Sequence, residues 1–189
     1  MKACTTDALT LCRTVVQHVR TEAARGGLPR FALNLGVQPA EFVYLTAVLG
    51  DGFMGPMPLP RAQVLPSPEF PHTALLALLW SFRAEATPTC WAAAAAVACG
   101  CFGRQHLWQD LGLTGRSEVT ALLQAYFPGL VALNHQHLKW KRFLFMRVGE
   151  QLGQPDLQPP HCEGCDGYAP CYGAAEHVAT VTSHAWGLA

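Results

Sequence analysis

Five consecutive alanines, residues 92–96, lie in the longest apolar stretch of the chain, residues 91–100. Thr87 and Pro88 precede this stretch, and these residue types favour the N-cap and the first turn of a helix. The sequence therefore predicts a helix that continues to Ala98 and can approach its neighbours closely, because alanine side chains are small. The stretch is shorter than the about 20 apolar residues needed to cross a bilayer, so we expect no membrane interaction.

Most of the remaining chain also shows helical spacing of apolar residues, and strand-like alternation is absent. The predicted helices cover residues 5–24, 40–49, 69–86, 87–98, 105–111, 117–127 and 130–152. Residues 50–68 contain five prolines and three glycines, a density that no helix interior tolerates, and are expected to form an extended loop or lid. We predict a mainly α fold: a single-domain helical bundle spanning residues 1–189, with a helical body at about 5–152.

The composition changes after Gly153, where prolines and glycines interrupt any regular element. Three of the eight cysteines fall in this Pro/Gly-rich stretch. We expect a cysteine-containing, metal-binding loop at about residues 153–173, followed by a C-terminal tail at residues 174–189.

The overall charge narrows the possible functions. Lysine plus arginine and aspartate plus glutamate both number 13, so the chain lacks the basic excess typical of nucleic-acid binders. The N-terminal residues lack the apolar core of a signal peptide, which suggests a cytoplasmic protein whose cysteines are thiols. No catalytic triad, phosphate-binding glycine loop or paired-carboxylate motif is present, so we do not expect a turnover enzyme.

The cysteine cluster gives the most specific indication of function. Cys162 and Cys165 form a C-x2-C pair, and Cys171 follows after five residues. A C-x2-C turn can direct two thiolates at one metal, and thiolates select zinc, copper(I) or iron in a sulfide cluster. His161 is a candidate fourth ligand for zinc, whereas three thiolates match a cluster of three irons and four sulfides. Spacing alone leaves iron–sulfur, zinc and no metal open.

Upstream segments distinguish these alternatives. Residues 106–113 read HLWQDLGL, residues 139–143 read KWKRF, and the cysteine cluster closes in Cys171-Tyr172-Gly173. In this order, these segments resemble the NifQ family over about residues 31–173, most strongly over residues 91–173. The resemblance implies an iron–sulfur carrier, with a 3Fe-4S type of cluster, that also holds molybdenum. Such a carrier donates molybdenum during assembly of the nitrogenase iron–molybdenum cofactor, in partnership with the assembly scaffold proteins.

The chain departs from the family pattern at two positions. The family motif is C-x4-C-x2-C-x5-C, and Leu157 stands where its first cysteine is expected. Gly149 stands where the family often has a further cysteine. The remaining three cysteines can still hold a three-iron cluster. The alternatives are a replaced ligand such as His161, a structural zinc protein, or a diverged family member with an altered metal site.

Other polar residues have both structural and functional interpretations. His106 is a further candidate metal ligand or a residue that starts a helix. Asp110 is expected to cap a helix or pair with Arg116, and a position near the metal is the further alternative. Cys99 and Cys101 are expected to pack in the core, as are the scattered Cys4, Cys12 and Cys90. A basic group, formed by Lys139, Lys141, Arg142 and Arg147, is either a solvated helix face or a site that attracts molybdate or an acidic partner.

Overall fold

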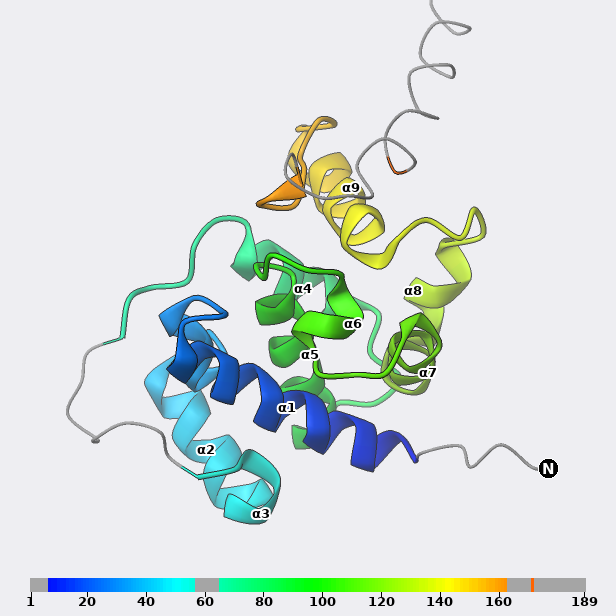
Figure 1. Cartoon of the computed structure of the whole chain (residues 1–189). Helices are drawn as coiled ribbons and strands as arrows, with labels where there is room; N and C mark the ends of the chain where they lie inside the picture. The colour runs from blue at the N-terminus through cyan, green and yellow to red at the C-terminus, as the bar shows by residue number, and fades with distance from the viewer. Residues whose placement is uncertain (1–6, 57–64, 163–170, 172–189) are drawn as a thin grey trace, which may run out of the picture.

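The computed structural model describes residues 7–56, 65–162 and 171, and in these the chain forms helices and no β-strand (Figure 1). The α-helices are α1 (Ala8–Arg25), α2 (Pro39–Leu49), α3 (Asp51–Met54), α4 (His72–Ser81), α5 (Pro88–Gly100), α6 (Leu107–Asp110), α7 (Arg116–Tyr126), α8 (Pro128–Leu133) and α9 (Trp140–Leu152). A 3-10 helix, η1 (Arg30–Asn34), follows α1. The mainly α prediction is confirmed. None of the helices in the described ranges is long and apolar enough to span a membrane.

Helix α5 forms the centre of the bundle, in contact with α1, α2 and α4. The Thr87 hydroxyl accepts a hydrogen bond from the Cys90 N–H at 3.2 Å, which confirms the predicted N-cap. Residues 92–99 are completely buried, so α5 contributes no polar face to the surface. At the end of α5, a Cβ on Gly100 would come within 2.5 Å of the Leu111 side chain. Small residues therefore allow the neighbouring segments to pack directly on this helix.

Helix α1 covers one side of α5 and begins where the Asp7 carboxylate accepts a hydrogen bond from the Leu9 N–H at 2.7 Å. It ends at Gly26, whose φ of 85° lies in the left-handed region that glycine adopts readily. The side chain of Arg20 is buried in this helix and donates to the Leu33 carbonyl at 3.0 Å and to the Gly55 carbonyl at 3.1 Å. Arg20 thereby fixes η1 and the end of α3 against α1.

Two predicted helices are wrong in their extent. Residues 130–152 form α8 and α9 rather than one helix, because Asn134 closes a loop between them. Its buried side chain accepts from the Leu138 N–H at 2.9 Å and donates to the Leu138 carbonyl at 3.0 Å. The helix predicted at residues 69–86 is shorter, since after α4 the Ala84 N–H turns to donate to the Tyr126 carbonyl at 2.8 Å.

The expected extended loop at residues 50–68 is also wrong at its start. Residues 51–54 form α3, whose Phe53 and Met54 are buried, and the Arg20 guanidinium donates to the Met54 carbonyl. Residues 57–64 lie outside the described part of the chain. The helix η1 was not predicted, because its short sequence shows no helical periodicity and its buried residues depend on contacts with α1.

His72, the first residue of α4, is completely buried in the core. Its Nε2 lies 3.5 Å from the Cys99 Sγ, and its ring packs edge-on against Phe31 with a centroid distance of 5.1 Å. Gly36 lies against the ring, so a Cβ there would come within 2.5 Å of it. Burial lowers the pKa of His72 from 6.5 to about 4, which keeps the imidazole neutral near pH 7.

We predict that His72 makes the fold sensitive to mild acid. Because its folded-state pKa is lower than its unfolded-state pKa, its contribution to stability is complete above pH 6.5. This stability is lost progressively as the pH falls from 6.5 to about 4, and the total loss is about 3 kcal/mol. Chemical denaturation measured at several pH values tests this. The variant His72→Gln should flatten the pH dependence in this window, and the exposed control His135→Gln should not. Equal slopes in both variants would contradict the assignment.

Candidate metal centre

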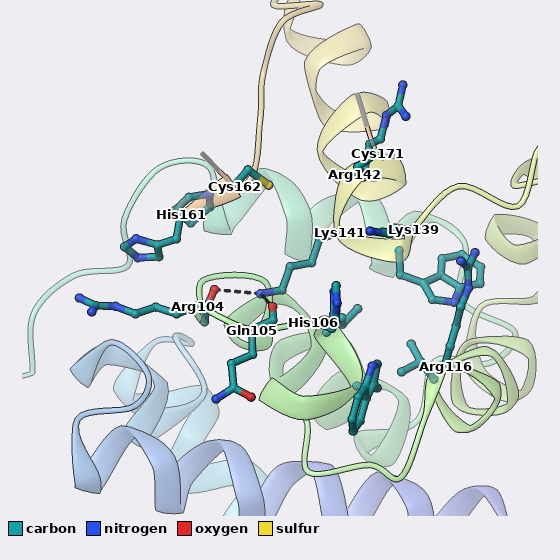
Figure 2. A pocket seen from close by; sticks show the side chains of 16 residues that line it. Arg104, Gln105, His106, Arg116, Lys139, Lys141, Arg142, His161, Cys162 and Cys171 are labelled. Atoms are coloured by element: carbon teal, nitrogen blue, oxygen red, sulfur yellow. Dashed lines mark hydrogen bonds between the residues drawn. The ribbon is translucent and has the colours of Figure 1, made fainter. Parts of the chain in front are cut away.

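A cavity of about 200 Å³ lies where the loop before α6, the start of α9 and the segment 160–162 meet (Figure 2). Two cysteines and two histidines line it together with five basic residues: Cys162, Cys171, His106, His161, Arg104, Arg116, Lys139, Lys141 and Arg142. The side chains therefore come from segments that are distant in the sequence. The two segments that carry the family resemblance, residues 106–113 and 139–143, both contribute to this cavity.

Cys162 and Cys171 are both half-buried and border the same cavity. Cys165, the third predicted ligand, lies outside the described residues. In Figure 2 the sulfur of Cys162 points toward the side of Lys141, whereas the ring of His161 extends away from it. Two thiols at one cavity fit the donor preference of zinc or iron–sulfide centres. Within the described ranges, however, no group of three His, Cys, Asp or Glu residues is close enough to hold a metal ion by itself.

His106 occupies the N-cap position of α6, as its predicted role in starting a helix requires. Its backbone N–H donates to the Gln109 side-chain oxygen at 3.1 Å, and its exposed side chain borders the cavity. The structure thus brings His106 to the same cavity as Cys162 and Cys171, and it remains a candidate ligand.

One ion pair fixes the wall of the cavity. The Lys141 ammonium lies 2.5 Å from the Asp110 carboxylate and also donates to the Gly103 carbonyl at 2.9 Å and the Gln105 carbonyl at 2.7 Å. The Asp110 side chain in turn accepts from the Gln105 N–H at 3.2 Å. Burial raises the pKa of Asp110, and the Lys141 ammonium opposes this shift. The expected pairing of Asp110 with Arg116 is wrong.

Gly103 makes this ion pair sterically possible, because a Cβ at this position would lie 2.2 Å from an Asp110 side-chain oxygen. Arg116 has a different role: its guanidinium donates to the His137 and Leu138 carbonyls, both at 2.7 Å. Arg116 therefore holds the loop that precedes α9. This loop contains His135 and His137, whose side chains are exposed.

The predicted basic group divides in two. Lys139, Lys141 and Arg142 line the cavity, whereas Arg147 lies one or two turns further along α9 and pairs with Glu150 at 2.5 Å. Sequence reasoning missed Arg104 and Arg116 as members of the same surface, because they are far from α9 in the chain. Arg104 lies two residues before the HLWQDLGL segment, and this proximity was the sequence signal that could have placed Arg104 at the cavity.

The two positions at which the resemblance predicted cysteine, 149 and 157, lie in contact with each other. A Cβ on Gly149 would lie 3.1 Å from the Leu157 Cβ and 2.3 Å from the Gln154 carbonyl oxygen. The Gln154 N–H donates to the Gly149 carbonyl at 2.8 Å and closes the turn after α9. A side chain at position 149 is therefore excluded unless this turn moves. Leu157 packs against the core and does not line the cavity.

The other described cysteines are core residues. Cys12, Cys90, Cys99 and Cys101 are buried and free, which confirms their predicted packing role, whereas Cys4 lies outside the described part. Burial raises the pKa of Cys12 and of Cys101 to about 12, so both remain protonated thiols near neutral pH.

We predict that Lys141→Met lowers the free energy of unfolding by about 3 kcal/mol, because it leaves the buried Asp110 carboxylate without its partner. Asp110→Asn should also destabilise the protein. The double variant should lose about 2 kcal/mol less than the sum of the single losses, which denaturant titration would measure. The exposed control Arg13→Met should have little effect. Additive losses from Lys141 and Asp110 would show that the pair is not coupled.

We also predict that Leu157→Cys does not restore the missing thiolate. Position 157 faces Gly149 rather than the cavity, so the variant should lose about 1 to 2 kcal/mol of stability from packing. Its metal content after anaerobic purification should equal that of the unmodified chain. Additional iron or zinc per chain would contradict this placement.

The NifQ family model matches residues 12–173. The protein NifQ of Azotobacter vinelandii is 40% identical over 81 residues, which are 43% of this chain and 42% of that protein. The protein NifQ of Klebsiella pneumoniae is 38% identical over 68 residues, 35% of this chain and 41% of that protein. In both comparisons the match spans less than half of the relative's length. No solved structure matches the chain.

A longer match comes from the protein NifQ of Rhodobacter capsulatus, which is 32% identical over 160 residues. These residues are 84% of this chain and 85% of that protein. The family model includes both segments at the cavity and all three clustered cysteines. Because the family model matches residues 12–173 and the Rhodobacter capsulatus protein matches 84% of the chain, this chain belongs to the NifQ family.

Proposed function

We propose that this protein carries molybdenum at an iron–sulfur site held by Cys162, Cys165 and Cys171 and donates it for assembly of the nitrogenase iron–molybdenum cofactor. Family membership supports the general part of this proposal, a role in nitrogen fixation and in the handling of molybdenum. The iron–sulfur site, the cytoplasmic location and the partnership with cofactor-assembly scaffold proteins are parts of the proposal.

The observation that carries the proposal is that Cys162 and Cys171 border one cavity although eight residues separate them. Thiolates that converge on a cavity are the donors that iron–sulfide and other soft metal centres use. Both cysteines are half-buried, which limits access of water while leaving a route for a metal to enter and leave. A carrier needs such a site, because its cargo must be both held and released.

The protein's own residues prepare this site in two ways. The Lys141–Asp110 pair fixes the loop at residues 103–106, and the turn closed at Gly149 leads the chain back toward Cys162. The bound cluster would supply the soft sulfur environment for molybdenum, with the three cysteines as its protein ligands. A carrier of this kind is not a turnover enzyme.

A structural zinc site is the second candidate, and His106 and His161 favour it because both border the same cavity as the cysteines. Zinc is commonly bound by a mixture of cysteine and histidine. In this case the metal would attach the C-terminal segment to α6 and α9 and would not be passed on. This alternative predicts a colourless protein with one zinc per chain.

We predict that the anaerobically purified protein contains iron, acid-labile sulfide and molybdenum, and that Cys162→Ser loses most of all three, because it removes a ligand. Absorbance near 400 nm and elemental analysis measure this. The control Cys90→Ser removes a buried thiol outside the cavity and should leave the metal content unchanged. One zinc without iron would exclude the carrier. An unchanged metal content in Cys162→Ser would remove Cys162 from the site.

A further inference from the structure

We infer that the exposed face of α2 is an interaction surface on which two copies of this chain pair about a twofold axis. This inference does not depend on the proposed function, because no residue of α2, all of which the structure describes, borders the metal cavity. Figure 1 shows α2 at the lower left of the helical body, whereas α9, which carries one wall of the cavity, lies at the top. A dimer formed through α2 would therefore leave both metal cavities open.

Helix α2 is apolar on both of its sides. Its buried residues, Phe42 and Leu45, belong to the core, and the helix contacts α5. The side turned away from the core also carries only apolar side chains, and all of them are exposed: Ala40, Val43, Tyr44, Ala47 and Val48. Their spacing is i, i+3, i+4, i+7 and i+8, which is the pattern of a helix face that packs against another element. The exposed face therefore has the character of a contact surface.

This face differs from the other exposed apolar side chains of the described residues. Seven large apolar side chains are exposed there, and three of them lie together on α2, with exposed fractions of 67% for Val43, 56% for Tyr44 and 52% for Val48. The other four lie singly on separate segments: Leu9, Phe70, Leu133 and Leu152. Single exposed apolar residues are normal, whereas a contiguous group marks a binding surface. The exposed face of α2 is thus the group that calls for a partner.

The order of large and small residues on this face selects a second copy as the partner. With 3.6 residues per turn, Ala40, Tyr44 and Ala47 lie along the middle of the face, and Val43 and Val48 flank them. When two such helices pair antiparallel about a twofold axis, Tyr44 of each copy lies over Ala47 of the other copy. The large ring then fills the space above a small side chain, so the face is complementary to itself, as a twofold interface requires. A parallel pairing would place the two Tyr44 rings against each other and leave gaps at the alanines.

Charge and area set the strength of this pairing. The chain has no formal net charge, so two copies do not repel each other at long range. The charged residue of α2 is Glu41, whose carboxylate already accepts a hydrogen bond from the Gln38 N–H at 2.9 Å. Since 56% of Tyr44 is exposed, its ring would bury on the order of 100 Å². The face of α2 supplies only part of the roughly 800 Å² that each partner of a stable dimer buries, so we expect a reversible dimer with a Kd on the order of 10 μM.

Sedimentation velocity of the full-length protein from about 1 to about 100 μM tests the inference. Tyr44→Ala should weaken the dimer by about tenfold or more, because it removes the central ring. Ala47→Tyr should also weaken it, although it adds apolar area, since two rings then compete for one space. The double variant Tyr44→Ala/Ala47→Tyr exchanges large for small and should restore the dimer. The control Leu9→Ala shortens a side chain that is 52% exposed on α1 and should dimerise normally. Circular dichroism would verify that each variant is folded.

A monomer at every concentration would overturn the interface, whether residues 57–64 or another protein then cover the face. Unchanged dimerisation of Tyr44→Ala, a stronger dimer in Ala47→Tyr, or an equal loss in Leu9→Ala would also overturn it. The variant Cys162→Ser separates this inference from the proposed function, because it should lose iron but keep the dimer. If it loses both, bound metal joins the copies and the α2 interface is wrong, while the carrier survives. If the purified protein contains only zinc yet dimerises through α2, the carrier fails and the interface stands.

Discussion

The buried pair between Lys141 and Asp110 is the interaction on which the cavity depends. It joins α9 to α6, and through the carbonyls of Gly103 and Gln105 it also fixes the loop between α5 and α6. A buried ion pair adds stability only when its remaining donors and acceptors are satisfied, and here the surrounding backbone groups satisfy them. The same ammonium therefore holds together three segments of the wall: α9, α6 and the loop at residues 103–106.

This arrangement requires a rigid support, which α5 provides. Its fully buried small side chains let α1 and α4 pack closely, and Gly100 admits the Leu111 side chain at the end where the cavity begins. Since α5 leads directly into the loop at residues 103–106, the position of this loop follows from the packing of the core. A functional side chain on a loop fixed in this way needs little reorganisation when it binds a ligand.

Features determined by neighbouring residues could be predicted from the sequence, and features determined by the fold could not. The cap at Thr87 and the end of α1 at Gly26 follow from local chemistry, as does the packing of Cys99. The break at Asn134 and the pairing of Asp110 with Lys141 depend on partners that only the folded chain supplies. For the same reason, the spacing of the cysteines indicated a metal site, but it could not reveal the cations around it.

The contact between Gly149 and Leu157, the two positions where the family motif predicted cysteine, makes both residues part of the fold. Two cysteines in contact could both bind metal, whereas here a residue without a side chain meets a large apolar one and the turn closes over it. The packed pair of Gly149 and Leu157 stabilises the turn that leads to Cys162.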